Sequence, residues 1–222
     1  MIIPETITID GPAGAGKSTL GELLARRLGY LYFDTGVMYR ALTLAALRRG
    51  ISPDDGGAMA ALAHDLDIDI RPPSLADGRQ YTVLVDGTDV TWDIRLPEVD
   101  QHVSAAASHP AVRAVMRARQ RAIGQRGRVV MVGRDIGTIV LPEARLKIYL
   151  EASLRARAQR RDAQLRARGQ PTDPRAIEAE VARRDALDSH VMGRAADAIV
   201  LSNDELSPDQ EIEIILDHLR KQ

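Results

Sequence analysis

The chain contains no cysteine among its 222 residues. Disulfide bonds, thiolate nucleophiles and thiolate metal sites are therefore excluded, and no oxidising compartment is required. A basic, apolar leader is missing at Met1–Glu5, and no later stretch has the apolar length that spans a bilayer. We therefore expect a cytoplasmic protein with no membrane partner.

An excess of positive charge is also missing, because the formal net charge is −1. We expect no nucleic-acid partner, since the global basic field that drives such binding is absent. The five histidines are scattered without ligand spacing, which argues against a zinc site. Hydrophobic residues make up 45% of the chain, enough to bury a sizeable core and to exclude disorder.

Short strand-like runs alternate with helical patterns along most of the chain. The strand-like runs are residues 6–9, 30–33, 129–132, 146–150 and 198–201. This alternation predicts an α/β fold, a five-stranded parallel sheet flanked by helices. Two stretches break it: residues 66–100 resemble a small antiparallel β insert, and residues 153–168 form an arginine-rich helix with turn residues after it. The last helix should start with Ser207 as N-cap and Pro208 at its first position.

The segment Gly11-Pro-Ala-Gly-Ala-Gly-Lys-Ser18 fits the phosphate-loop pattern G-x-x-x-x-G-K-[ST] between an expected strand and an expected helix. In such a loop backbone N–H groups surround the phosphates, Lys17 neutralises their oxygens and Ser18 ligates Mg²⁺. The alternative is a glycine loop that only caps a helix, and the presence of every fixed position argues against it. The expected ATP-binding residues are Gly11, Pro12, Ala13, Gly14, Ala15, Gly16, Lys17, Ser18 and Thr19.

The phosphate loop alone leaves the reaction open, because GTP switches, motor ATPases and small-molecule kinases share it. The chain has no Asn-Lys-x-Asp, the element by which GTP switches usually read guanine. It is short for a motor, and it shows no Ser-His-Asp arrangement. These observations favour a small-molecule kinase.

Arginines near strand ends are the candidates for holding a second substrate. Arg40 follows the second strand, with Thr35 and Tyr39 on one helix face, and could fork onto a phosphate. The alternative is a helix cap followed by a solvated arginine. Arg134 and Asp135 follow the strand at 129–132, and the alternative there is a buried Arg–Asp pair that closes a tight turn.

Three further helices carry candidate charges. Arg113, nearest the start of the helix after Pro110, stands out from a basic stripe that is otherwise solvated. Arg157 and Arg161 share a face of the arginine-rich helix and suit a clamp on a transferring phosphate. Arg184 and Asp188 lie one turn apart, where an i,i+4 ion pair is the alternative.

Together, the motifs at residues 11–18, 34–40, 133–138 and 183–188 resemble those of the cytidylate kinases of bacterial type, within the nucleoside monophosphate kinase family. The resemblance covers nearly the whole chain and includes the antiparallel insert. It implies a monomer that transfers the ATP γ-phosphoryl group to CMP or dCMP and requires Mg²⁺. The alternatives are a kinase for another small acceptor, such as UMP, AMP or shikimate, and a non-catalytic nucleotide switch.

The resemblance also implies roles for individual residues. Arg40 and Arg134 would hold the acceptor phosphate, Asp135 would read the cytosine, and sugar contacts would come from the 184–188 segment. The full CMP-binding set is Thr35, Tyr39, Arg40, Ser104, Arg113, Arg134, Asp135, Arg184 and Asp188. The catalytic set is Lys17, Arg134, Arg157, Arg161 and Arg184.

The expected domains follow from the same reading. The phosphate-loop core comprises residues 1–34, 103–150 and 173–222, the acceptor-binding arm residues 35–102, and a helical lid residues 151–172. In one place the sequence departs from the family pattern, since Val191 stands where that family commonly has an arginine. Arg194 is the candidate replacement.

Overall fold

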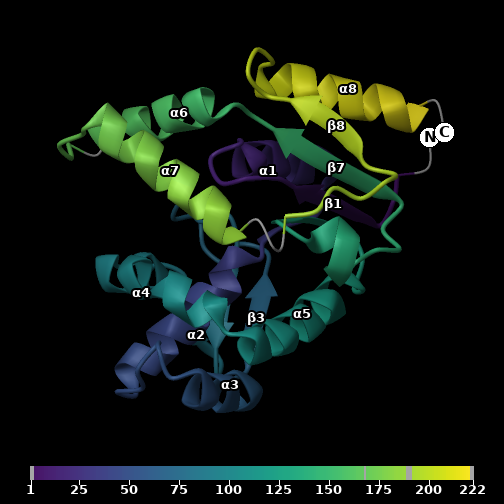
Figure 1. Ribbon diagram of the computed structural model, residues 1–222. Helices are drawn as coiled ribbons and strands as arrows, with labels where there is room; N and C mark the ends of the chain where they lie inside the picture. Colours follow the sequence, from purple (N-terminus) through teal and green to yellow (C-terminus); the bar gives the residue numbers. More distant parts are fainter. Residues whose placement is uncertain (1–2, 168, 189–191, 221–222) are drawn as a thin grey trace. The chain divides into compact units, whose positions relative to one another are not determined.

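The computed structural model describes residues 3–167, 169–188 and 192–220. They form two compact units (Figure 1). The first unit comprises Met1–Gly29 and Val130–Gln222, and the second comprises Tyr30–Val129. Each unit is described by itself below. None of the helices in the described part of the chain combines the length and apolarity that a bilayer crossing requires.

The main sheet has five strands in the order β2-β6-β1-β7-β8. Their bounds are β1 Thr6–Asp10, β2 Leu31–Asp34, β6 Val129–Gly133, β7 Leu146–Glu151 and β8 Ile199–Ser202. β1 pairs in parallel with β7, and β7 in parallel with β8, so that Asp10 lies opposite Tyr149. Ile7, Ile9 and Leu150 are fully buried, as expected for strands that are covered on both faces. The predicted five-stranded parallel sheet is confirmed.

The helices of the first unit divide into two groups. They are α1 Lys17–Leu28, α6 Leu154–Ala167, α7 Pro174–Asp188, α8 Pro208–Arg220 and the short helix η2 Ile136–Val140. α8 contacts α1 and lies along β8, whereas α6 and α7 pack on each other (Figure 1). Ala158, Ile177 and Val181 form a small apolar core of their own between α6 and α7. The arginine-rich helix is therefore one arm of a helical hairpin.

The start of α8 agrees with its predicted cap. The Gln210 N–H donates to Ser207 Oγ at 3.3 Å, and the Ser207 N–H donates to Gln210 Oε1 at 2.8 Å. Pro208 occupies the first helical position, where its missing N–H costs nothing. Ile212, Ile215 and Leu219 lie buried along one face of the helix.

The second unit combines four α-helices and one short 3₁₀ helix with a small antiparallel sheet. Its elements are α2 Gly36–Arg48, α3 Gly56–Asp65, β3 Ile68–Arg71, β4 Thr82–Val85, β5 Thr88–Asp89, η1 Asp93–Arg95, α4 Pro97–Ser108 and α5 Pro110–Gly124. The three strands pair antiparallel in the order β3-β4-β5, as the sequence predicted for the insert. α2 contacts α3 and α4, and α5 contacts both α3 and α4.

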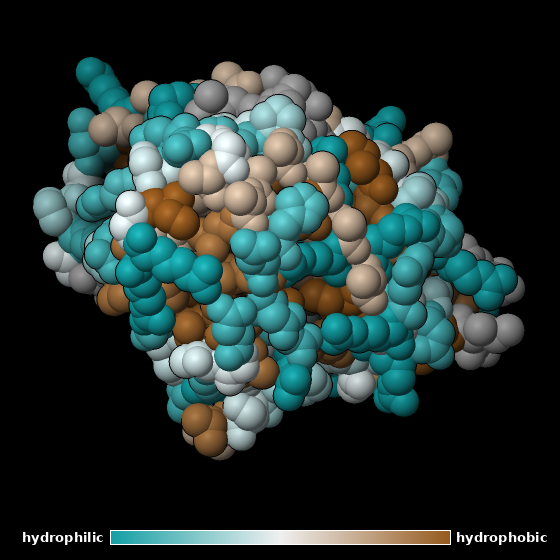
Figure 2. Space-filling model, turned by 90° about the horizontal axis from the view of Figure 1, so that it is seen from below, coloured by the Kyte–Doolittle hydropathy of each residue, from teal (hydrophilic) through white to brown (hydrophobic). Residues whose placement is uncertain are grey.

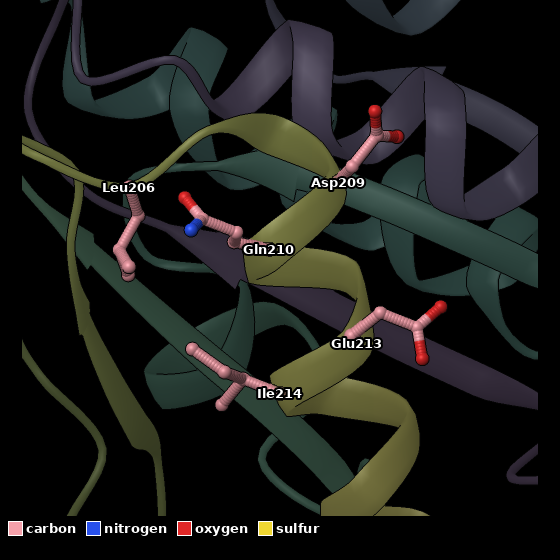
Figure 3. A pocket seen from close by; sticks show the side chains of 5 residues that line it. All are labelled: Leu206, Asp209, Gln210, Glu213 and Ile214. Atoms are coloured by element: carbon pink, nitrogen blue, oxygen red, sulfur yellow. The ribbon is translucent and has the colours of Figure 1, made fainter.

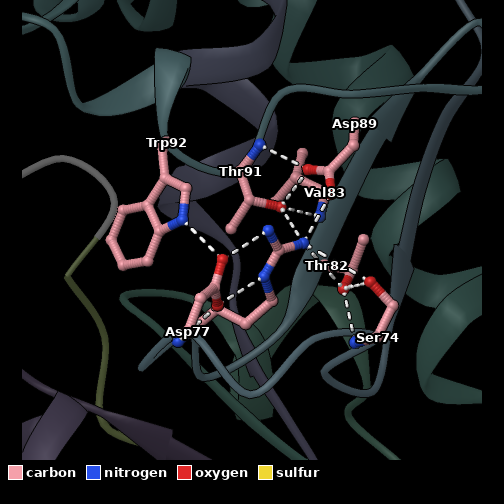
Figure 4. A network of polar contacts seen from close by, with 8 residues as sticks. Ser74, Asp77, Thr82, Val83, Asp89, Thr91 and Trp92 are labelled. Atoms are coloured by element: carbon pink, nitrogen blue, oxygen red, sulfur yellow. Dashed lines mark hydrogen bonds and ion pairs between the residues drawn. The ribbon is translucent and has the colours of Figure 1, made fainter.

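A buried arginine organises the insert (Figure 4). The Arg79 side chain is 4% exposed and forms ion pairs with Asp77 at 2.7 Å and with Asp89 at 2.5 Å. Arg79 holds the pKa values of both carboxyls below their ordinary range. The Trp92 indole N–H donates to Asp77 Oδ2 at 2.9 Å, and the Val83 N–H donates to Thr91 Oγ1 at 2.9 Å. The network therefore ties the loop before β4 to the residues after β5.

Candidate active site

The phosphate loop lies between β1 and α1 in the first unit. Its last glycine, Gly16, occupies the N-cap position of α1 and supplies no side-chain acceptor, and no acidic residue stands in the first turn of that helix. The positive end of the helix therefore meets no carboxylate in its own first turn that would compete with a bound anion. Lys17 begins the helix, and its Nζ donates to the Pro12 carbonyl oxygen at 2.7 Å.

Two glycines of this loop are required by both conformation and space. Gly11 has φ 147° and Gly16 has φ 98°, in the region that L side chains rarely adopt. A Cβ on Gly11 would collide with the Leu150 carbonyl oxygen, and a Cβ on Gly16 would collide with the Asn203 side-chain amide. The loop is thus packed directly against the ends of β7 and β8.

Arg157 joins the helical hairpin to this loop. Its side chain is buried, and its Nη1 donates to the Ala13 carbonyl oxygen at 3.1 Å. The guanidinium also forms a bidentate pair with Asp185 of α7, at 2.9 and 2.6 Å. Arg161 lies half-buried one turn further along α6, and Arg184 lies half-buried beside Asp185. The first unit therefore brings Arg157 to the loop with its charge neutralised by Asp185.

A second arginine of α6 reaches the loop through an amide. Arg160 Nη2 donates to Asn203 Oδ1 at 3.1 Å, and Asn203 Nδ2 donates to the Ala15 carbonyl oxygen at 2.7 Å. Glu211 of α8 is completely buried, and burial raises its pKa to about 7 while Arg160 opposes the shift. Neither Arg160, Asn203 nor Glu211 was predicted from the sequence, because a side-chain relay of this kind leaves no local motif.

Arg134 and Asp135 stand in the turn between β6 and η2. Asp135 is buried, and its carbonyl oxygen accepts from the Ile139 and Val140 N–H groups at 2.9 and 3.1 Å. Asp10, at the end of β1, also holds this turn. Its carboxylate accepts from the backbone N–H groups of Ile136 and Gly137. Burial raises the pKa of Asp10 to about 6, an effect that these two N–H groups oppose.

The second unit holds the other predicted acceptor residues. Thr35 precedes α2 and Tyr39 lies within it, both buried, while Arg113 of α5 places its guanidinium carbon 5.8 Å from the centre of the Tyr39 ring. Arg40 donates to the Ile94 carbonyl oxygen at 3.1 Å and pairs with Asp100 of α4 at 2.5 Å. Arg40 is therefore a paired arginine rather than a solvated one. Ser104 is exposed on α4.

Two predicted positions fall where the description ends. Asp188 is the last residue of α7, and its side chain lies outside the described residues. Val191, the departure from the family pattern, lies outside them as well.

The start of α2 bears on the helix cap that was the alternative for the segment with Thr35. Asp34 Oδ1, from the residue before Thr35, accepts from the Gly36 N–H at 3.0 Å.

Cavities of similar volume open at two places on the described part of the first unit. One of about 390 Å³ adjoins the phosphate loop at Pro12 and is lined by polar groups that include Tyr149, Glu151 and Asp204. The other, of about 400 Å³, lies over the outer face of α8 between Leu206 and Ile214 (Figure 3). The first of these is lined by Pro12, a residue predicted to bind ATP.

Known proteins match this sequence over nearly its whole length. The family described as cytidylate kinase matches residues 7–221. The chain belongs to the cytidylate kinase family. It is 63% identical to a cytidylate kinase of Chloroflexus aggregans and 61% identical to one of Roseiflexus castenholzii, in each case over 97% of this chain and 94% of the relative.

The fold of this cytidylate kinase family member also occurs among solved kinase structures. A shikimate kinase from Bacteroides thetaiotaomicron superposes with a TM-score of 0.50, covering 97% of this chain and 96% of the other at 14% identity. At that identity the likeness shows the shared phosphate-loop kinase fold alone. The predicted fold class is therefore confirmed.

The residues at the loop suit a magnesium ion that arrives with a nucleotide. Mg²⁺ prefers oxygen ligands and usually binds through one or two protein groups together with phosphates and water. Ser18 offers one hydroxyl, exposed in the first turn of α1. Among the described residues no cluster of three or more acidic, histidine or cysteine side chains could hold a metal by itself. The donor set thus fits a shared ion rather than a resident one.

Proposed function

We propose that this chain transfers the γ-phosphoryl group of ATP to CMP or dCMP, giving ADP and CDP or dCDP. The observation that carries the proposal is the family match over residues 7–221, and it is supported by a glycine loop that leads into the N-terminus of α1. The relatives at 63% and 61% identity are themselves cytidylate kinases. Shikimate as acceptor is not favoured, because that likeness extends to the fold alone.

The donor side is built from the loop, Lys17 and the hairpin arginines. Backbone N–H groups of residues 11–19 and the Lys17 ammonium neutralise the ATP phosphates. Arg157 already touches the loop at Ala13, and it spreads the charge of the transferring group once phosphate oxygens replace Asp185 as its partner. Arg161 and Arg184 act on the same charge. Mg²⁺, held by Ser18, supplies further charge neutralisation when bound.

The acceptor side is proposed from the same residues as the resemblance gave. Arg40 and Arg134 bind the CMP phosphate with Thr35 beside them, and Arg184 and Asp188 contact the sugar. Ser104, Arg113 and Asp135 read the cytosine, and Tyr39 completes the CMP-binding set. The contact between Arg113 and Tyr39 supports the pairing of these two in one group. A carboxylate such as Asp135 accepts from the exocyclic amine of cytosine, whereas it would face a carbonyl oxygen in uracil.

The chemistry needs no general base, because the attacking group is already an anionic phosphate oxygen. The protein must bring two polyanions together in line and screen their charge, and it must exclude water that would otherwise hydrolyse ATP. Arginines and a lysine serve the first need. The predicted lid, residues 151–172, serves the second by closing over the loop. The monomeric state and the cytoplasmic location stay predictions of this proposal.

The test is a coupled assay of ADP release with ATP as donor across CMP, dCMP, UMP, AMP and shikimate. We expect CMP and dCMP to give the highest kcat/KM, with UMP lower by about 10-fold or more, as one misplaced polar group in a recognition site costs. Lys17→Ala is the control for contaminating kinases and should abolish release with every acceptor. Equal rates with and without any acceptor would rule the proposal out in favour of a nucleotide switch.

A further inference from the structure

Asp10 is a buried carboxylate that the proposed reaction does not use. It is the last residue of β1 and is 4% exposed, and the next residue in the chain, Gly11, starts the phosphate loop. A negative charge beside a loop that binds polyanions repels the ligand. The presence of a carboxylate at this position therefore calls for another explanation. Its surroundings contain charges of both signs, because Lys17 and Asp135 each act on its carboxylate.

The side chain of Asp10 makes hydrogen bonds to one turn of the described chain. Asp10 Oδ1 accepts from the Ile136 N–H at 2.8 Å, and Oδ2 accepts from the Gly137 N–H at 2.7 Å. These two N–H groups start the helix η2, so the carboxylate caps it in the way that acceptors stabilise helix N-termini. Both oxygens of one side chain therefore hold the segment that immediately follows Arg134 and Asp135.

The space around Gly137 shows how closely this turn lies against β1. A Cβ on Gly137 would come 2.9 Å from Thr8 Oγ1, 3.2 Å from Lys147 Cδ and 3.3 Å from Asp10 Oδ2. Gly137 has an ordinary backbone conformation, so the demand for glycine comes from close approach alone. The turn can therefore approach β1 this closely only if residue 137 is glycine.

We propose that Asp10 is a positioning residue that fixes the acceptor-recognition turn, Gly133–Gly137, against the phosphate loop. One end of Asp10 is covalently joined to that loop, and the other end holds the turn by two hydrogen bonds. In-line phosphoryl transfer depends on such alignment, since a misplacement of about 1 Å costs about 100-fold in rate. The inference rests on the proposed function, in which Arg134 and Asp135 bind CMP.

The experiment is Asp10→Asn in the 222-residue chain. Asparagine keeps the size and one acceptor oxygen, but its NH₂ group would face one of the two backbone N–H donors. The turn must shift, so we expect kcat/KM for CMP to fall by about 10- to 100-fold, through a lower kcat as well as a higher KM for CMP, and the ratio of kcat/KM for CMP to that for UMP to fall. The KM for ATP should stay the same or fall, because the loop keeps its contacts and loses a neighbouring negative charge.

Asp217→Asn is the matched control, since it makes the same change at an exposed carboxylate on α8 and should leave both KM values unchanged. Gly137→Ala is a second variant, because it leaves Asp10 intact and lifts the turn from β1; it should reproduce the loss that is specific to CMP. The positioning role would be overturned if kcat/KM fell equally for ATP and CMP, if kcat/KM for CMP did not change, or if neither variant folded. If the wild-type enzyme did not phosphorylate CMP, the proposed function itself would be wrong.

Discussion

Glu211 is the clearest case in which a single residue opposes the stability of this fold. Its side chain is completely buried, and among the described residues neither carboxylate oxygen has a hydrogen-bond partner. Burial raises its pKa from 4.5 to about 7, with the Arg160 charge opposing. A carboxyl with a raised pKa in the folded state stabilises that state below pH 4.5 and loses this contribution as the pH rises through 7.

Glu211→Gln therefore should stabilise the protein at neutral and alkaline pH. The variant removes the ionisation, so we expect a gain of about 1–3 kcal/mol in the free energy of unfolding at pH 8. At pH 5 the native carboxyl is mostly protonated, and the gain should largely vanish. Urea denaturation followed by circular dichroism at both pH values measures the difference. The same gain at the two pH values would contradict a titrating Glu211.

At the scale of the element, the insert of the second unit combines buried apolar side chains, such as Ile70 and Val83, with the buried guanidinium of Arg79. Arg79 reaches Asp77 and Asp89 together because its planar guanidinium offers several donors in a fixed fork. Arg79→Lys keeps the charge but cannot make both contacts. We expect amide hydrogen exchange in β4 and at Thr91 to accelerate by about fivefold or more. Peptides from β7 serve as the internal control, and unchanged exchange in β4 would show that the strands hold without the fork.

Elements marked by local chemistry could be predicted, and elements without such marks could not. The β-branched run at 6–9 and the Ser207–Pro208 start of α8 carry their signals within a few residues, and both predictions are confirmed. α3 was missed because Gly56 and Gly57 are poor helix formers, and only the Asp55 cap, whose Oδ1 accepts from the Ala58 N–H at 3.0 Å, marks its start.

The site divides along the same line. The phosphate loop is a continuous motif, so its geometry followed from the sequence. The contact of Asp10 with the turn after β6 joins residues 126 positions apart, and no spacing rule connects them. A signal was nevertheless present, since a carboxylate directly before a phosphate loop conflicts with the charge of the ligand. The carboxylate of Asp10 holds this turn by accepting from the backbone N–H groups of Ile136 and Gly137.

For the whole molecule, the chain path makes the two units depend on each other. The first unit is assembled from residues on both sides of the second. If the second unit unfolded alone, its roughly 100 residues would form a closed loop, at a cost of about 4 kcal/mol in chain entropy. This penalty favours a single transition in which both units unfold together.

Hydrophobic and hydrophilic residues are interspersed on the surface that Figure 2 shows.

Trp92, the only tryptophan, lies in the second unit and reports this coupling. A non-hydrolysable MgATP analogue at about 100 times its Kd should stabilise the first unit by about 2.7 kcal/mol. Because we expect joint unfolding, the midpoint followed by Trp92 fluorescence should rise as much as the midpoint followed by far-ultraviolet circular dichroism. Lys17→Ala, which removes a phosphate contact, should show neither rise. If the circular dichroism midpoint rose and the Trp92 midpoint did not, the second unit would unfold independently. The entropic cost of closing the unfolded loop would then be too small to couple the two units.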